Sequence, residues 1–478
     1  MMFNSFRFLF VFLPVVTVGY AAFQRYAGPR VAQAFLLLSS LVFYAVAKPV
    51  YVFLLIGSIL FNWAVAVGIG IEDVDAMPLQ LAKRKRMLQL GLVGNILFLG
   101  SFKYFNFFLL HLPAYHGIRF TLPDWSFPLG ISFFTLTQIM YLVDTYQGLN
   151  APNSLFDHAT LVSMFPYVTS GPLVRSRAIV PQLTKRTDTN DRLEVACRGL
   201  LIFALGLAKK VIIADSFARI ADAGFGSTGS LSMLEGWVFS LSYTFQIYFD
   251  FSGYSDMAVG AAWMLGIDIP INFNAPYRSK SISEFWQRWH ISLSNFITNY
   301  MFTPILRAMG KATLKTSVFA VLVAMAIAGL WHGPAWTFIL FGTLHGIALA
   351  CNQVWKKKRL KMPDWIGWLL TFVFVNAAFI FFRSPNVPAA LHLLRATLPH
   401  AALFGTSALK GVVPLTPLLI VRPITFGIVL AFFFKTSYDV ARSFARNYLS
   451  AFGTALLLGA CILYMNSTAA KEFVYFAF

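Results

Sequence analysis

The sequence is short of charged residues. Only 12% of its 478 residues are Asp, Glu, Lys or Arg, whereas 58% are hydrophobic. Soluble globular domains carry about 25% charged residues, so this composition excludes an ordinary soluble enzyme. The sequence also lacks the residue-by-residue alternation of apolar and polar side chains that is typical of membrane β-barrels. We therefore expect an all-α, polytopic integral membrane protein.

Cysteine is equally scarce. Cys197, Cys351 and Cys461 lie far apart in apolar surroundings, and no Cys-x-x-Cys or zinc-ligand spacing is present. We expect packed thiols, no metal site and no bound cofactor. A repeat of fixed period is also missing, and the length suits one large helical domain rather than several soluble ones. The expected organisation is a single membrane-embedded domain over residues 1–478, with most motifs in a core at about 125–355.

Acidic residues are outnumbered two to one. The chain has 38 Lys and Arg against 19 Asp and Glu, a formal net charge of +19. Nucleic acid is the usual partner of such a balance, but the positive-inside rule of membrane proteins is the better explanation, so we expect no nucleic-acid partner. Basic clusters at Lys83–Arg86 and Lys356–Lys361 stand between apolar segments. On the cytoplasmic face they would meet anionic membrane lipid and an anionic substrate such as a nucleotide-bearing thioester.

Long apolar runs predict about ten to twelve membrane-spanning helices, with re-entrant segments between them. We expect the first run to remain as a helix rather than to be a signal peptide, because its N-terminus carries only Arg7 and no clear cleavage site follows. The expected spans are Met2–Tyr20, Val31–Ala47, Val50–Ile71, Leu88–Leu110, Cys197–Ala214, Met233–Leu265 as one long or two tilted helices, Val318–Leu330, Trp336–Cys351, Trp365–Phe382, Ile424–Phe434 and Ala451–Tyr464.

The basic residues also set the expected orientation. Arg25 and Arg30 follow the first span, and the cluster Lys83–Arg86 follows the third. Both basic loops are expected inside, which places the N-terminus outside, together with the loop His111–Trp125. Two prolines and a glycine make Phe165–Arg175 too broken for a plain span, so we expect a re-entrant segment there.

A polar motif interrupts the long apolar run after residue 233. Asp250, Ser252, Tyr254 and Asp256 follow one another within seven residues. Ionisable residues inside a span mark a functional site or a tightly paired one. On a helix, Asp250 and Tyr254 share a face because they are four residues apart. A structural alternative has equal weight, in which the two acids pair with a buried arginine or cap a helix break at Gly253.

A second motif combines aromatic and basic side chains. Ser281 and Glu284 have the spacing of a capping box and predict a helix that contains Trp289 and His290. Its aromatic residues suit the membrane interface. Alone, His290 is explained equally well as an interfacial hydrogen-bond donor.

The third motif is Trp331-His332-Gly333-Pro334 between two apolar runs. A histidine in such a run is costly unless it faces protein or a water-filled cavity, and Gly-Pro predicts a helix break. The alternative is a histidine that only caps a helix end. His332 follows His290 by 42 positions, which allows one helix to turn back, so the two imidazoles can meet. His345 would lie about 20 Å further along a continuous helix, and we expect a supporting or structural role for it.

Taken together, these motifs resemble the membrane-bound O-acyltransferase superfamily. They are most similar to its bacterial branch, which includes the membrane subunit of alginate O-acetylation and the D-alanyl transfer protein of teichoic acid modification. Jointly the motifs are specific, although each alone is weak. The stretches that carry the resemblance, in family order, are Pro128–Phe133, Gly171–Arg175, Tyr248–Asp256, Ser283–Ser294, Gly329–Gly333 and His345-Gly346.

The resemblance implies a funnel-shaped helical fold with a central tunnel in the bacterial inner membrane. It implies that His332 is the catalytic histidine and His290 the second active-site histidine. The donor would be a cytoplasmic thioester, acyl-CoA such as acetyl-CoA or an acyl carrier, and the acceptor a hydroxyl on the other side. Residues expected to support the site or line the tunnel are Asp250, Ser252, Tyr254, Asp256, Arg175, Trp289, Trp331 and His345.

The first expectation for the activity is O-acetylation of an exported polysaccharide such as alginate or cellulose, with an extracytoplasmic partner protein or a polysaccharide-modification complex. Transfer of D-alanyl or another acyl group to a different envelope acceptor is the alternative. The chain departs from the polysaccharide-acetylating pattern between Ile297 and Arg307, where the Arg-Asp pair and the double glycine are missing. This departure concerns the acceptor and the partner rather than the chemistry.

With the resemblance, the hypothesis for the mechanism is acyl transfer from a thioester to a hydroxyl. His332 suits a general base that takes the acceptor's hydroxyl proton, and His290 suits a group that orients the donor or stabilises the developing oxyanion. A proton-coupled transporter is the rival class, because intramembrane acids, broken helices and histidines occur there as well. It ranks lower because no half-to-half symmetry is visible. A purely structural membrane subunit fits the hydropathy but not the clustering of polar residues.

Overall fold

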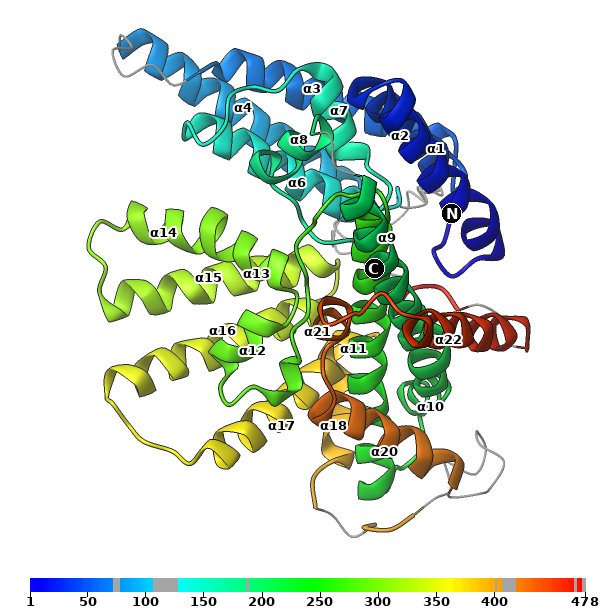
Figure 1. The fold of residues 1–478 in the computed structure, drawn as a ribbon. Helices are drawn as coiled ribbons and strands as arrows, with labels where there is room; N and C mark the ends of the chain where they lie inside the picture. Colours follow the sequence, from blue (N-terminus) through cyan, green and yellow to red (C-terminus); the bar gives the residue numbers. More distant parts are fainter. Residues whose placement is uncertain are drawn as a thin grey trace, which may run out of the picture. The chain divides into compact units, whose positions relative to one another are not determined.

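The computed structural model describes residues 1–71, 78–105, 128–185, 189–399, 402–405, 418–467 and 471–474. The loop expected at His111–Trp125 lies outside these residues. The chain forms two compact units, residues 1–201 with 258–270 and residues 202–257 with 271–478. All regular elements in the described ranges are helices (Figure 1).

The first unit is built mainly from N-terminal helices. A π-helical turn, Phe8–Phe12, leads into the first of them. The others are α1 (Leu13–Tyr26), α2 (Pro29–Ala45), α3 (Val50–Ile69), α4 (Pro78–Lys103), α6 (Ile131–Tyr146), α7 (Leu155–Ser163) and α8 (Ser176–Leu183).

The second unit contains the histidine motifs. Helices α9 (Thr189–Ala208) and α11 (Met233–Met264) cross the boundary between the units. The remaining elements are a π-helix at Lys209–Ala214, α10 (Asp215–Phe225), a 3₁₀ turn at Pro276–Arg278, α12 (Ile282–Arg288), α13 (Ile291–Phe296), a π-helix at Ile297–Phe302, α14 (Thr303–Ala308), α15 (Leu314–His332), α16 (Trp336–Lys357), α17 (Asp364–Arg383), α18 (Val387–Ala396), α20 (Leu418–Phe433), α21 (Ser437–Arg442) and α22 (Tyr448–Ser467).

Six helices in the described ranges are long and apolar enough to cross a membrane, fewer than the ten to twelve expected. They are Phe8–Tyr26, Val50–Ile69, Leu314–His332, Trp336–Lys357, Asp364–Arg383 and Tyr448–Ser467. Two shorter apolar helices, Pro29–Ala45 and Pro423–Phe433, add to them. Helices α4, α9 and α11 have the necessary length, but charged residues interrupt their apolar runs.

Two loop predictions were wrong because helices begin earlier than the apolar runs do. The basic cluster Lys83–Arg86 lies inside α4, which starts at Pro78, and not in a loop. Within the cluster, Arg84 is buried and donates hydrogen bonds to the carbonyls of Ile69 and Tyr146. The polar residues from Lys185 to Arg192 predict a loop in the sequence, but residues 189–192 open α9. Charged side chains in a first helical turn thus look like loop residues in a hydropathy profile.

The broken segment between α7 and α8 is irregular, as predicted, and residues 164–174 of it are buried. Gly130, immediately before α6, lies against this segment with φ of +76°. A Cβ atom at Gly130 would come within 2.3 Å of the Val168 carbonyl oxygen, so only glycine fits this position. The close approach holds the buried irregular segment against the start of α6.

Candidate active site

His332 is the last residue of α15, so the predicted helix break is confirmed. Helix α16 begins at Trp336 after a short extended connection. The His332 side chain is buried, and its ring lies 5.1 Å from Phe382 and 6.1 Å from Phe341, centre to centre. Trp331 beside it is half-buried, with its ring 4.9 Å from the imidazole. The imidazole is therefore held in an aromatic surrounding at a helix end.

Glycines set the position of this helix end. Helices α15 and α16 lie side by side, and a Cβ on Gly342 would come within 2.3 Å of the Met325 carbonyl oxygen. A Cβ on Gly329 would come within 2.4 Å of the Phe338 carbonyl oxygen. Small residues that let two helix backbones touch are a common device of membrane helix packing. The antiparallel pair brings the His332 end of α15 against the first turns of α16.

His290 does not lie in the helix predicted to contain it. Helix α12 ends at Arg288, and His290 is the residue before α13, with φ of +43° and ψ of +53°. Left-handed backbone is unusual for a residue other than glycine and is found preferentially at functional sites. Asn272 fixes the turn, because its backbone and side-chain oxygens accept the N–H groups of Ile291 and Ser292 at 3.0 and 3.1 Å. The His290 side chain is 1% exposed.

The predicted N-terminal cap of α12 is present. Ser281 Oγ accepts the N–H of Glu284 at 3.2 Å. The carboxylate of Glu284 accepts the N–H of Lys280 at 2.8 Å, one residue earlier than a capping box requires. The start of α12 is therefore well defined.

A chain of aromatic contacts connects the two histidine motifs. Trp289, next to His290, lies 5.2 Å from Phe379, and Phe379 lies 6.4 Å from Phe382. Phe382 in turn contacts the His332 ring. The two motifs thus border one aromatic cluster, and direct contact between the two imidazoles stays a prediction.

His345 links α12 to α16. The indole N–H of Trp286 donates to His345 Nδ1 at 3.2 Å, so the proton of the neutral ring is on Nε2. The expected separation of 20 Å from His332 does not apply, because the helix is broken and both rings contact Phe341, at 6.1 and 4.6 Å. His345 is fully buried. Its contacts suit the supporting role expected for it.

The acids of α11 are paired with lysines rather than with an arginine. Lys210 Nζ lies 2.6 Å from Asp250 Oδ1, and Lys209 Nζ lies 2.7 Å from Asp256 Oδ2. Lys210 also pairs with Asp215 at 3.0 Å. Helix α11 is continuous through its motif, so the alternative of a helix break at Gly253 was wrong.

The sequence motifs did not predict that Lys210 and Asp215 belong to this cluster. A usable signal was the pair of adjacent lysines at the end of a long apolar run, because each buried ammonium group needs an anionic partner. The spacing within the chain did not reveal which acid each lysine would choose.

The other expected site residues occupy different surroundings. Ser252 is fully buried in α11. The Tyr254 ring stacks on Phe473, near the C-terminus, at 4.5 Å. Arg175, the residue before α8, belongs to the first unit and is half-buried.

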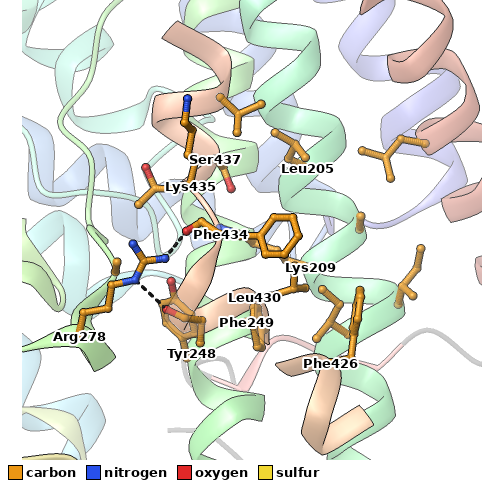
Figure 2. Close-up of a pocket in the computed structure, with 18 residues that line it drawn as sticks. Leu205, Lys209, Tyr248, Phe249, Arg278, Phe426, Leu430, Phe434, Lys435 and Ser437 are labelled. Atoms are coloured by element: carbon orange, nitrogen blue, oxygen red, sulfur yellow. Dashed lines mark hydrogen bonds between the residues drawn. The ribbon is translucent and has the colours of Figure 1, made fainter. Parts of the chain in front are cut away.

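A pocket of about 330 Å³ lies beside the aromatic cluster (Figure 2). Tyr248 lines it, and the Tyr248 ring also contacts Trp289 at 6.4 Å. Arg278 lies at the pocket edge and donates to the carbonyls of Ala431 and Phe434 (Figure 2). The ionisable side chains of the lining, apart from that tyrosine, are three cations, Lys209, Arg278 and Lys435. Within the described ranges, no three His, Cys, Asp or Glu side chains gather as metal ligands.

Comparison with known proteins shows which family the chain matches. Residues 79–386 match the family described as "MBOAT, membrane-bound O-acyltransferase family". The chain is 37% identical to the peptidoglycan O-acetyltransferase of Helicobacter pylori over 100% of this chain and 98% of that protein. It is 36% identical to a probable alginate O-acetylase of Pseudomonas aeruginosa, over 91% of this chain and 81% of that protein.

A teichoic acid D-alanyltransferase of Bacillus subtilis is 29% identical over 57% of this chain and 71% of that protein. The matched family region contains the α11 motif, His290, the helix break at His332 and His345. The chain belongs to the membrane-bound O-acyltransferase family and is a multi-pass O-acyltransferase.

Proposed function

We propose that this enzyme transfers an acetyl group from a cytoplasmic thioester to a sugar hydroxyl of a cell-envelope polysaccharide, at the bacterial inner membrane. The observation that carries the proposal is His332, a buried imidazole at a helix break within an aromatic cluster that also borders His290. The two O-acetylating relatives, similar over most of both chains, support acetyl as the group transferred.

His332 acts as the general base. It takes the proton of the acceptor hydroxyl while that oxygen attacks the thioester carbonyl carbon. The tetrahedral intermediate collapses with cleavage of the C–S bond, and the proton held by His332 passes to the leaving sulfur. His290 stabilises the negative charge that develops on the carbonyl oxygen. The aromatic surroundings keep water away and so limit hydrolysis of the thioester.

The cationic pocket suits the donor side. Acyl-CoA carries phosphates, and Lys435 and Arg278 belong to a pocket whose wall includes Tyr248, a neighbour of Trp289. We expect Lys435→Glu to raise the KM for acetyl-CoA several-fold with little change in kcat, because charge attraction acts mainly on binding. Arg446→Glu makes the same charge change on an exposed residue outside the pocket lining and should leave the KM unchanged.

Two features bear on the acceptor. The segment that departs from the polysaccharide-acetylating pattern forms a π-helix at Ile297–Phe302 and then α14, and Thr298 and Asn299 are exposed on it. The peptidoglycan-modifying relative is similar over the full length of this chain. The candidate acceptors are therefore a peptidoglycan-type sugar and an alginate-type sugar. An extracytoplasmic partner protein or modification complex that presents this acceptor to the enzyme completes the proposal.

The test is acetyl transfer from radiolabelled acetyl-CoA in membrane vesicles that contain equal amounts of each variant. Replacing the base in His332→Ala should lower the rate at least about 100-fold, which is the usual size of general-base catalysis. His392→Ala provides the control, because this histidine is outside the cluster and bonds only a loop carbonyl, that of Gly229, among the contacts described. A near-normal rate in His332→Ala contradicts the mechanism.

A further inference from the structure

The last described residues of the chain, Lys471–Val474, return to the α11 motif. Phe473 is 4% exposed, and its ring stacks on Tyr254 at 4.5 Å and contacts Phe251 at 5.6 Å. More than two hundred residues separate these partners along the chain. We call Lys471–Val474 the C-terminal segment.

Backbone groups of this segment complete a buried ion cluster. Lys210 Nζ donates to the Glu472 carbonyl at 3.2 Å, in addition to its pairs with Asp250 and Asp215. The N–H of Val474 donates to Asp250 Oδ2 at 2.8 Å. Lys210 Nζ therefore donates hydrogen bonds to Asp215 and to the Glu472 carbonyl and forms an ion pair with Asp250. Without the segment, a buried ammonium and a buried carboxylate would each lose a partner, which is costly in a low-dielectric surrounding.

The segment also reaches His290 through one intermediate ring. The Phe251 ring meets the His290 imidazole edge-to-face at 4.7 Å and 90°, and its packing includes Phe473. Edge-to-face contacts of this kind have a defined geometry. A ring held on one side by the C-terminal segment therefore limits the orientations available to the imidazole on the other.

We propose that the C-terminal segment is a positioning element of the acyl-transfer site, which acts by holding Phe251 and Asp250 and so fixes the imidazole of His290. This inference rests on the proposed role of His290. It assigns a part in the reaction to residues that begin 125 positions beyond His345-Gly346, the last motif of the family pattern.

The first test removes the aromatic ring. In the full-length protein, Phe473→Ala should lower kcat for acetyl transfer from acetyl-CoA about 10-fold or more and leave the KM for acetyl-CoA unchanged, because the segment acts through His290 and not on the donor. Phe473→Tyr should restore the rate, since it keeps the ring. Phe404→Ala, at an 84% exposed phenylalanine, is the matched control and should behave as wild type.

The second test removes the backbone donor. Val474→Pro lacks the N–H that binds Asp250 and should lower kcat, whereas Val474→Ala keeps it and should not. The variants Val474→Pro and Val474→Ala test the same positioning role if Phe473→Ala fails to fold. A fall in Tm with kcat unchanged per folded molecule would show a structural role only and would overturn the inference.

A double-mutant cycle separates the inference from the function on which it rests. If Phe473 acts through His290, Phe473→Ala should cause no further loss in a His290→Ala background. Independent, multiplicative losses would overturn the positioning role but leave the proposed function intact. If His290→Ala alone has normal activity, the proposed role of His290 itself fails, and with it the inference.

Discussion

The buried ion cluster of Lys210, Asp215 and Asp250 is the most sensitive polar feature at the scale of single residues. Lys210 and Asp250 have side-chain exposures of 3% and 1%. Removing Asp250 leaves Lys210 paired with Asp215 alone and leaves the N–H of Val474 without its acceptor. A buried donor that loses its partner typically costs about 1–3 kcal/mol. We expect Asp250→Ala to lower the free energy of unfolding in detergent by this amount.

The matched control for this prediction is Asp364→Ala. Asp364 pairs with Lys280 on the surface, with side-chain exposures of 74% and 55%. Solvent and salt screen such a pair, so no measurable change in stability is expected. Equal effects of the two substitutions on the unfolding curve would show that burial does not strengthen the α11 pair.

His158 predicts a dependence of stability on pH. It lies in the short helix α7, outside the six spanning helices, and burial lowers its pKa to about 3. The unfolded chain binds a proton near pH 6.5 whereas the folded chain does not, so stability present above pH 6.5 is lost as the pH falls toward 3. The slope is up to about 1.4 kcal/mol per pH unit.

The measurement is Tm in detergent between pH 4 and 7. His158→Leu should flatten the acid side of the curve, because the variant has no imidazole to protonate. His392→Leu, at a half-buried position whose described hydrogen bond is to the Gly229 carbonyl, should keep the wild-type curve. An unchanged acid slope in His158→Leu would rule out His158 as the acid-sensitive group.

Single residues also show what the sequence could and could not reveal. The break after His332 was predictable because Gly-Pro is a local signal. The left-handed backbone of His290 was not, because it depends on Asn272, eighteen residues earlier, which binds the turn from outside. The partners of Asp250 were not predictable either, because they lie far from it in the sequence. A carboxylate in an apolar run indicates that a cation is near but does not indicate which one.

At the scale of elements, the α15–α16 pair depends on glycine. A Cβ at Gly342 would lie 2.3 Å from the Met325 carbonyl oxygen and 2.8 Å from Gly329 Cα, both backbone atoms that cannot move aside independently. We expect Gly342→Ala to separate the helices, to destabilise the protein by about 1–3 kcal/mol and to lower kcat by displacing His332.

Gly57→Ala in α3 is the control for this substitution, because a Cβ there meets nothing within 4 Å. Replacing glycine by alanine in an open helical position is neutral or stabilising by up to about 1 kcal/mol. Tm and kcat measured on both variants decide the matter. A Gly342→Ala enzyme with normal Tm and normal kcat would contradict the tight packing of α15 against α16.

Elements were predicted best where apolar runs are long and uninterrupted. Helices α3, α16 and α17 begin within a residue of their expected starts. The start of helix α4 was not predicted correctly. Its first turns carry the cluster Lys83–Arg86, and charged residues in a hydropathy profile indicate a loop. Helix α12 ended early, because the turn at His290 depends on tertiary hydrogen bonds that no local pattern records.

At the scale of the whole chain, the second unit has one strongly basic end. Ser317 Oγ donates to Gln353 Oε1 at 3.1 Å, so the start of α15 lies beside the end of α16. Asp364, at the start of α17, pairs with Lys280. Cations therefore collect at this end: Lys280, Lys311, Lys315, Lys356, Lys357, Lys358, Arg359 and Lys361. From the positive-inside rule we expect this end to lie in the cytoplasm.

His332 and Pro334 lie at the opposite end of the same helix pair. The 19 residues of α15 rise about 28 Å at 1.5 Å per residue, close to the thickness of the hydrocarbon core. If the basic end is cytoplasmic, the thioester of the proposed function has to reach deep into the protein to meet His332, and we expect a tunnel to provide this path. The acceptor hydroxyl needs only a short path from the other face.

Cysteine labelling tests this orientation. In a chain with Cys197→Ser, Cys351→Ser and Cys461→Ala, Pro334→Cys should react with a membrane-impermeant maleimide on intact spheroplasts, since Pro334 is exposed at the non-cytoplasmic end. Lys358→Cys, at the basic end, should react only after the membrane is permeabilised. The reverse pattern would place the basic end outside, and the thioester would then have to be supplied from the side of the membrane where the cell does not make it.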